Sequence, residues 1–235
     1  MIDVRETYIL TTRYILVQLS DLRAFFLLLI QAPIIGYSIS LIWDQGKSQL
    51  YFIMIVSCVW FGVINACREI IKEKDIYIRE RIFGLNPSSY ILSKIIVLLM
   101  VCFIQCAILI LVVSCNVRLT CNVRYLFVIL VLCSLGGVNL GLIISSFVNS
   151  SEKALALAPI ITIPQIMFSK VLEPEISGWA AIVEKAMIVK WGFDAVSEIT
   201  LGKSRVFELG KPLVILVGYS IAYYLLTLLL LRREV

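Results

Sequence analysis

The sequence predicts an all-α integral membrane protein with six transmembrane helices. Its composition is the first reason: of 235 residues, 60% are hydrophobic and only 16% are charged. A soluble domain is typically about 45–50% apolar and about 25% charged. The second reason is a series of six apolar stretches, because roughly 20 apolar residues in a helix cross the hydrocarbon core of a bilayer. Together these observations indicate a chain that is built for lipid.

The chain is expected to form a single transmembrane domain over residues 1–235, opening with an amphipathic segment. Residues 1–23 mix apolar side chains such as Val4, Tyr8 and Leu19 with Arg5 and Asp21. This mixture predicts a helix that lies in the membrane interface with its polar side in water. The interspersed charges do not match the layout of a cleavable signal peptide.

The six predicted spans follow this segment. Trp43, Tyr51 and Tyr125 lie near the ends of spans, where aromatic rings favour the headgroup region. Residues 173–211 are expected to form a long outer loop, and its moderately apolar pieces are too short to cross. They predict re-entrant or interfacial helices before the last span. The spans are placed at residues 24–43, 50–67, 91–115, 125–148, 154–172 and 212–231.

The placement of basic residues predicts the orientation. Residues 68–90 are rich in Lys and Arg, and so are the N-terminal segment and the C-terminal end. The opposite short loops carry only Lys47, Arg118 and Arg124. Because cytoplasmic loops are enriched in Lys and Arg, both termini are predicted to be cytoplasmic. The protein is expected to be a multi-pass protein of the plasma (cytoplasmic) membrane, which is the inner membrane in a cell that has two membranes.

Several classes of function are disfavoured by missing residues. The sequence has no His and no Cys-x-x-Cys pair, so no metal site is expected. Gly-Lys-Ser occurs at residues 46–48 and 202–204, but Leu41 and Ser197 stand where a phosphate-binding loop needs another Gly. The chain is therefore not expected to hydrolyse ATP, to bind a cofactor itself or to be an enzyme. The near absence of ionisable residues within the spans also disfavours an ion pump.

Two sets of small residues have more than one interpretation. Gly137 and Gly141 are four residues apart in the fourth span, a spacing that lets helices approach closely. They could form a dimer interface or pack within one chain. Cys115 and Cys121 could form a disulfide in an oxidising compartment, although two free thiols are the default interpretation.

The densest set of charged residues is the predicted cytoplasmic segment 68–90. Its charges alternate at helical spacing until Gly84 and Pro87 end the helix. One interpretation is a solvated hairpin that only fixes topology. The other is a helix that docks on a partner chain, with three apolar residues as anchors and charged residues beside them. That candidate site comprises Arg79, Glu80, Arg81, Ile82, Phe83, Gly84 and Leu85.

A resemblance favours the docking interpretation. The segment resembles the stretch after the second span in the membrane domains of G-subfamily ABC transporters, whose pattern is roughly E-R-x-x-F-x-R-E-x-x-x-G-x-x-x-x-x-x-Y-x-L-[AS]-K. The chain differs from it mildly at Lys74 and Tyr77. Weaker matches follow in the family's order at residues 12–14, 31–33, 156–159, 168–169 and 191–195. The matching residues are Glu73, Tyr77, Arg79, Glu80, Gly84, Tyr90, Leu92, Ser93 and Lys94.

The resemblance implies a permease (an ABC type-2 permease) that works without an ATPase domain of its own. Two copies of a separate ABC ATPase subunit would bind ATP and Mg, and a second permease copy or a sister subunit would complete the transporter. Membrane lipid is an expected partner, and nucleic acid is not. In that family spans two and five line a cavity between the two copies. The corresponding candidates here are Phe52, Val59, Phe61, Ile163 and Phe168.

The expected activity is export of a hydrophobic or amphipathic cargo, such as a lipid, a drug-like compound or a modified peptide, by alternating access. The alternative is a membrane scaffold or signalling module that couples to an ATPase but transports nothing. The sequence leaves the cargo unidentified.

Overall fold

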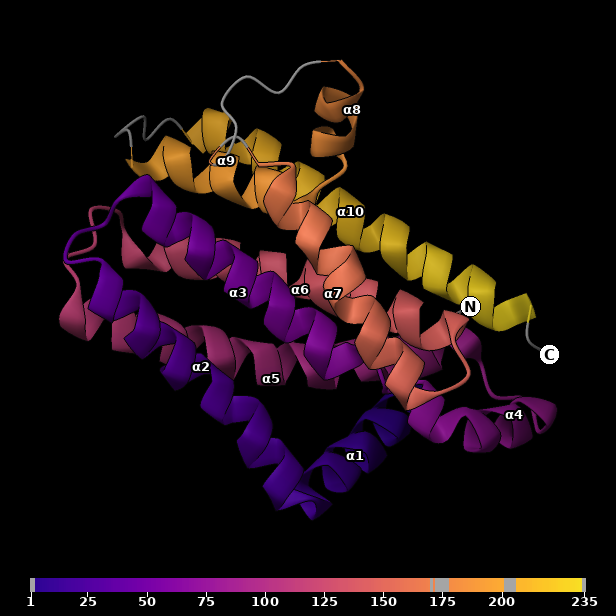
Figure 1. Ribbon diagram of the computed structural model, residues 1–235. Coiled ribbons are helices and arrows are strands. Elements are labelled where there is room, and N and C mark those ends of the chain that lie inside the picture. Colours follow the sequence, from indigo (N-terminus) through magenta and orange to yellow (C-terminus); the bar gives the residue numbers. More distant parts are fainter. Residues whose placement is uncertain (1–2, 170, 172–177, 201–205, 234–235) are drawn as a thin grey trace.

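The computed structural model describes residues 3–169, 171, 178–200 and 206–233. Every regular element in these ranges is a helix (Figure 1), which confirms the all-α prediction. The helices are α1 Val4–Ser20, α2 Leu22–Ile42, α3 Ser48–Ala66, the short 3-10 turn η1 Ile71–Glu73, α4 Lys74–Ile82, α5 Pro87–Asn116, α6 Val123–Phe147, α7 Ser151–Met167, α8 Trp179–Lys185, α9 Ile188–Thr200 and α10 Val206–Arg233.

Polar caps fix where several helices begin. Asp21 directly follows the last residue of α1, and its side chain accepts a hydrogen bond from the Ala24 N–H at the start of α2. The chain therefore turns sharply at Asp21, and α1 and α2 form the two arms of a V (Figure 1). Asn86 caps α5 in the same way, with Pro87 in the first turn, where its missing N–H costs nothing.

Five helical segments in the described residues are long and apolar enough to cross a membrane. They are Leu22–Ile42, Ser48–Ile82, Pro87–Asn116, Val123–Phe147 and Gly210–Arg232. Helix α7 is different because it has 17 residues and ends at Met167, whereas the predicted span continued to residue 172, which lies outside the described residues. At about 1.5 Å per residue, α7 reaches about 26 Å. The described residues therefore contain five candidate spans, as a multi-pass membrane protein requires, and the sixth span stays a prediction.

Helices α3 and α6 form the centre of the bundle, and small residues allow their backbones to touch. Gly137 lies against the carbonyl oxygen of Val59. A Cβ atom added to Gly141 would lie 2.7 Å from the Cβ of Ala66, far too close for two carbon atoms. Both glycines thus pack within one chain in this structure, where the sequence left intramolecular packing and a dimer interface open.

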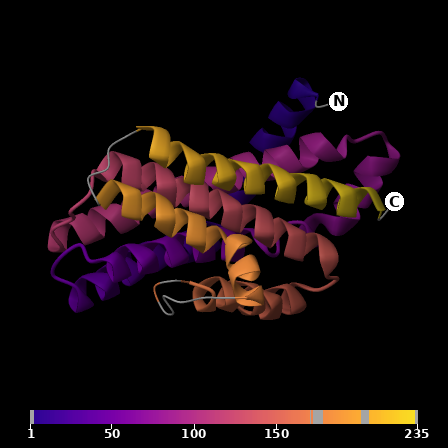
Figure 2. The same ribbon diagram turned by 90° about the horizontal axis from the view of Figure 1, so that it is seen from above.

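The C-terminal half covers this centre. Helices α9 and α10 lie side by side along α6 (Figures 1 and 2), and Gly192 of α9 lies against Cys133 of α6. Helix α9 is thus part of the bundle, within the region predicted as an outer loop. Residues 173–177 and 201–205 of that loop lie outside the described residues.

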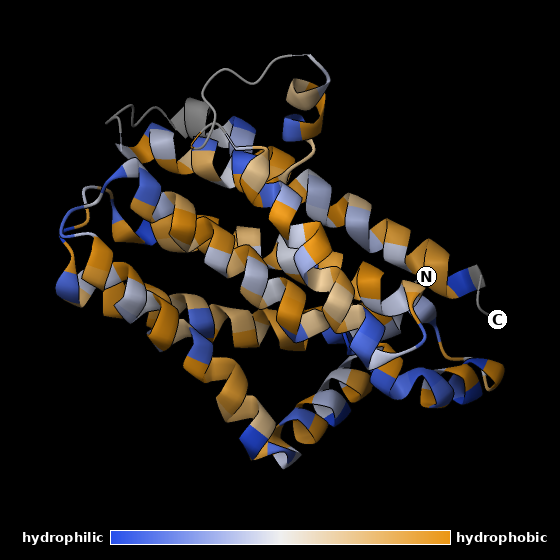
Figure 3. Cartoon of the chain, viewed as in Figure 1, coloured by the Kyte–Doolittle hydropathy of each residue, from blue (hydrophilic) through white to orange (hydrophobic). Residues whose placement is uncertain are grey.

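The turns between helices gather at two ends. The α2–α3 and α5–α6 turns meet at one end, where the Gly46 N–H donates to the Arg118 carbonyl oxygen at 2.9 Å. The segment with η1 and α4 lies at the other end, together with α1 and the described end of α10 (Figure 1). Hydrophobic colour runs along the long helices, whereas α4 is largely hydrophilic (Figure 3). Cys115, in the last turn of α5, and Cys121, in the α5–α6 turn, are both free thiols.

Candidate functional site

Two highly exposed large apolar side chains lie at the tip of α4, at the polar end of the bundle. Phe83 is 91% exposed and Ile82 is 72% exposed. Gly84 follows with a φ of +100°, a backbone conformation that glycine adopts without strain. The turn is closed by Arg81, whose guanidinium donates to the Leu85 carbonyl oxygen at 3.1 Å. Phe83 is thus held outward at a sharply defined reversal of the chain.

Helix α1 contacts the residues on both sides of this tip. The Arg13 guanidinium donates to the Glu80 carboxylate, and this hydrogen bond raises the pKa of Arg13. The Glu6 carboxylate accepts from the Asn86 N–H at 2.9 Å, immediately before α5. A cavity of about 330 Å³ separates the two elements beside these contacts. It is lined by Glu6, Leu10, Arg13, Glu80, Phe83, Gly84 and Leu85.

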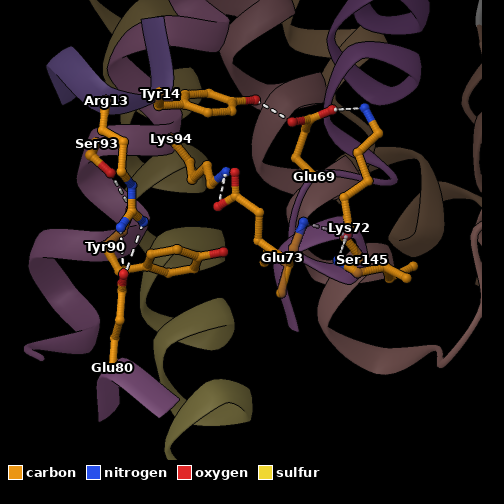
Figure 4. A network of polar contacts seen from close by, with 12 residues as sticks. Arg13, Tyr14, Glu69, Lys72, Glu73, Glu80, Tyr90, Ser93, Lys94 and Ser145 are labelled. Carbon is orange, nitrogen blue, oxygen red and sulfur yellow. Dashed lines mark hydrogen bonds and ion pairs between the residues drawn. The ribbon is translucent and has the colours of Figure 1, made fainter. Parts of the chain in front are cut away.

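A buried ion pair connects this region to α5. The side chain of Lys94 is 2% exposed, and its ammonium group lies 2.6 Å from the Glu73 carboxylate (Figure 4). The same ammonium group lies 3.6 Å from the centre of the Tyr14 ring, a cation–π distance. A buried charge needs such partners because the loss of its hydration is costly. The pair therefore connects α5 to η1 and α1.

A second set of contacts extends to α6. The Tyr14 hydroxyl donates to the Glu69 carboxylate, which also pairs with Lys72 at 2.7 Å (Figure 4). Burial raises the pKa of Tyr14 well above its usual range, so the phenol stays protonated and keeps donating. The Ser145 hydroxyl oxygen of α6 accepts from the Ile70 N–H at 2.9 Å. The chain between α3 and α4 is therefore fixed on three sides.

These contacts connect the segment between α3 and α4, and α4 itself, to α1, α5 and α6. The charged groups of this region pair with one another rather than surrounding a reaction site. In the part of the chain that the structure describes, no three His, Cys, Asp or Glu side chains are grouped so that they could hold a metal ion.

Comparison with known proteins identifies the family. The family described as "ABC-2 family transporter protein" matches residues 43–229. The chain belongs to this ABC-2 transporter family. A relative of this ABC-2 protein is an ABC transporter ATP-binding/permease protein of Mycobacterium tuberculosis, 26% identical over 157 residues. The alignment covers 63% of this chain but only 18% of the relative, so the ABC-2 chain spans less than a fifth of that protein's length.

The structure separates the predicted docking residues of the ABC-2 chain into two groups. Arg79, Ile82 and Phe83 are exposed, as a docking surface requires. Glu80 instead binds Arg13, and Leu85 is 9% exposed and packs inside the chain. Leu85 therefore supports the turn, which leaves Ile82 and Phe83 as the exposed apolar side chains of the predicted site.

The predicted cavity residues of the ABC-2 chain also divide. Phe52, Val59 and Phe61 are buried among the helices of one chain, and the Phe52 ring contacts Phe193 edge to face, with ring centres 6.1 Å apart. Ile163 of α7 is 51% exposed, and Phe168 is half-buried at the end of that helix. Only the α7 side of the set is thus free to face a second chain in this conformation.

Sequence reasoning missed the contacts of Arg13, Tyr14, Glu73 and Lys94, although all four belong to the segments that carry the resemblance. Lys94 did carry a signal. It is a charged residue within the predicted span 91–115, and such a residue normally has a partner and a function. The acidic residues of the preceding segment were the obvious candidates for that partner.

Proposed function

We propose that this ABC-2 chain is the permease subunit of an exporter that moves a hydrophobic or amphipathic cargo: a lipid, a drug-like compound or a modified peptide. Two separate ABC ATPase subunits bind ATP and Mg and supply the energy. The observation that supports this best is Phe83, which is 91% exposed on a segment fixed by ion pairs to the rest of the bundle. An exposed apolar side chain on a loosely held segment would only lower solubility. Phe83 lies on a segment that is held in a fixed position, which suits docking on a partner.

In the proposed mechanism, the ATPase subunits close on ATP and press on the segment at residues 79–85. The Arg13–Glu80 pair carries this movement into α1, and the Lys94–Glu73 pair carries it into α5. A second permease copy or sister subunit faces this one, and their helices rearrange so that a cavity between them opens outward. Ile163 and Phe168 are our candidates for that cavity, with Phe52, Val59 and Phe61 reached only if the packing of α3 changes.

The proposal requires α4 to face the cytoplasm, and thiol labelling in intact cells tests this orientation. With the native cysteines replaced, Asp75→Cys is expected to react only after the membrane is permeabilised, whereas Lys47→Cys reacts with an impermeant reagent from outside. Both positions are exposed. A failure to react therefore means that the membrane blocks the reagent, and not that the thiol is buried in the protein. Reaction of Asp75→Cys from outside would rule out docking on a cytoplasmic ATPase.

Export also predicts that cargo and ATP hydrolysis are coupled. The permease is co-purified with its ATPase, and hydrolysis is measured with and without two probes, a short-chain phosphatidylethanolamine and a lipophilic cationic dye. We expect at least one probe to raise the hydrolysis rate and to be accumulated in inverted vesicles when ATP is present. A constant rate without accumulation would favour the scaffold or signalling alternative.

A further inference from the structure

A second and larger cavity lies at the elbow between α1 and α2. It has a volume of about 690 Å³ and is lined by residues of α1, α2, the polar end of α3 and η1. Figure 1 shows the V that α1 and α2 form. This volume lies within the range of small-molecule sites, about 300–1,000 Å³. The residues used below all line it: Asp21, Phe25, Leu27, Leu28, Asn65 and Arg68.

The polar side of the cavity has unused binding capacity. Its acidic residues Glu69 and Glu73 are already paired with Lys72 and Lys94. Arg68 makes no ion pair with any described residue. Asn65 is 3% exposed, and its amide nitrogen donates to the Gln105 side chain at 2.7 Å. Its Oδ1 atom is buried and has no partner among the described residues, so it is free to accept a hydrogen bond once the side chain turns toward the cavity.

The opposite side of the cavity is apolar and continues onto the surface of α2. Phe25 and Leu28 are partly buried in it, and Leu27 is 67% exposed. The exposed side chains of Phe26 and Ile30 extend the same surface along the predicted span. Arg68 directly follows the second span, at the cytoplasmic headgroup level predicted by the distribution of Lys and Arg. The cavity thus joins a cation at headgroup level to an apolar surface at acyl-chain level.

We propose that this cavity binds one phospholipid of the inner leaflet whose headgroup carries an anionic phosphate and a hydroxyl group. The phosphate pairs with Arg68, a headgroup hydroxyl donates to the Asn65 Oδ1 atom, and an acyl chain lies along Phe25 and Leu27. The lining as a whole is not basic, but Arg68 is a cation without a carboxylate partner among the described residues, and a cation at the cytoplasmic headgroup level attracts a lipid phosphate. Asp21 at the rim of the cavity caps α2 by accepting from the Ala24 N–H. Its negative charge disfavours a second anionic group on the headgroup in addition to the phosphate. Phosphatidylglycerol combines all these features.

The site is tested on the full chain alone in detergent, by native mass spectrometry. Dioleoyl phosphatidylglycerol is titrated in parallel with dioleoylglycerol, which lacks the phosphate, and with glycerol phosphate, which lacks the acyl chains. We expect saturable binding of one phosphatidylglycerol per chain and much weaker binding of both fragments. Arg68→Gln should weaken this binding about tenfold or more, because a hydrogen bond to a charged group is lost.

Arg5→Gln is the matched control because Arg5 is a basic residue of the same polar end that does not line the cavity. It should leave the binding unchanged. If Arg68→Gln is unstable, Ala24→Trp tests the site independently, since it fills the cavity from an exposed position of α2. Equal effects of Arg68→Gln and Arg5→Gln, or equal binding of dioleoylglycerol, would overturn the site. Equal binding of glycerol phosphate would show that the ligand is a soluble phosphate compound and not a lipid, and would overturn the lipid site.

This experiment contains no ATPase and no transport step. Its failure would therefore leave the proposed permease function intact, and failure of ATPase docking would leave the lipid site intact.

Discussion

Phe83→Ala is expected to weaken binding of the ATPase about 30-fold or more while leaving the permease folded in the membrane. An aromatic anchor in a desolvated pocket of a partner contributes about 2 kcal/mol or more, and every 1.4 kcal/mol is about a tenfold change in affinity. The ring is 91% exposed in the isolated chain, so its removal takes little from the core. The measurements are retention of the ATPase during co-purification and hydrolysis stimulated by cargo.

Two variants of α4 serve as comparisons. Ile76→Ala removes an apolar side chain that is 41% exposed but lies near the other end of the helix, and the ATPase should be retained. Glu80→Ala removes the partner of Arg13 but leaves the Phe83 ring in place. Both side chains of that pair are partly exposed, at 41% and 31%. Loss of the pair should therefore lower the free energy of unfolding by only about 0–1 kcal/mol. Full retention and normal stimulation with Phe83→Ala would refute docking through this tip.

The sequence located the helices well because the length of an apolar stretch largely determines whether it can cross a membrane. Helices α2, α3, α5 and α6 begin within a few residues of the predicted spans. Helix α7 ends before residue 172, the predicted end of its span, because Phe168 leaves the helical conformation, with φ −85° and ψ 50°. Hydropathy placed the end later because Val171 and Leu172 are apolar again after Ser169 and Lys170.

The faces of the helices were harder to predict. In the sequence Ile82, Phe83 and Leu85 form one apolar group, but the turn at Gly84 directs Leu85 into the chain and leaves the other two exposed. Val59 and Phe61 illustrate the same difficulty. An apolar residue in a span is equally suited to lipid, to a partner chain or to the interior, and only packing against α6 distinguishes these environments.

The buried ion pair gives the second large effect. Glu73→Gln should destabilise the chain by about 3–5 kcal/mol, the usual cost of leaving one charge of a buried pair without its partner. Lys94→Met should cost less, because it leaves behind the Glu73 side chain, which is 18% exposed, whereas Glu73→Gln leaves Lys94, which is 2% exposed. Unfolding of the purified chain in detergent, followed by heat or denaturant, measures both losses.

The pair between Lys190 and Asp194 is the matched control. Its atoms are 2.9 Å apart, but Lys190 is 12% exposed and Asp194 is 36% exposed. Asp194→Asn therefore leaves a less buried cation than Glu73→Gln does, and it should lower the free energy of unfolding by less. A loss no larger for Glu73→Gln than for Asp194→Asn would contradict the burial of the Lys94–Glu73 pair.

The double variant Glu73→Gln/Lys94→Met separates stability from transmission. Removing both charges of a buried pair together is often neutral or even stabilising, so most of the stability lost in Glu73→Gln should return. The connection between η1 and α5 would still be missing, because neither replacement side chain restores an ion pair. If that connection carries the movement of the ATPase into the bundle, the double variant should bind the ATPase normally through Phe83 and yet lose its response to cargo. A double variant that regains both stability and the response to cargo would show that the pair serves folding alone.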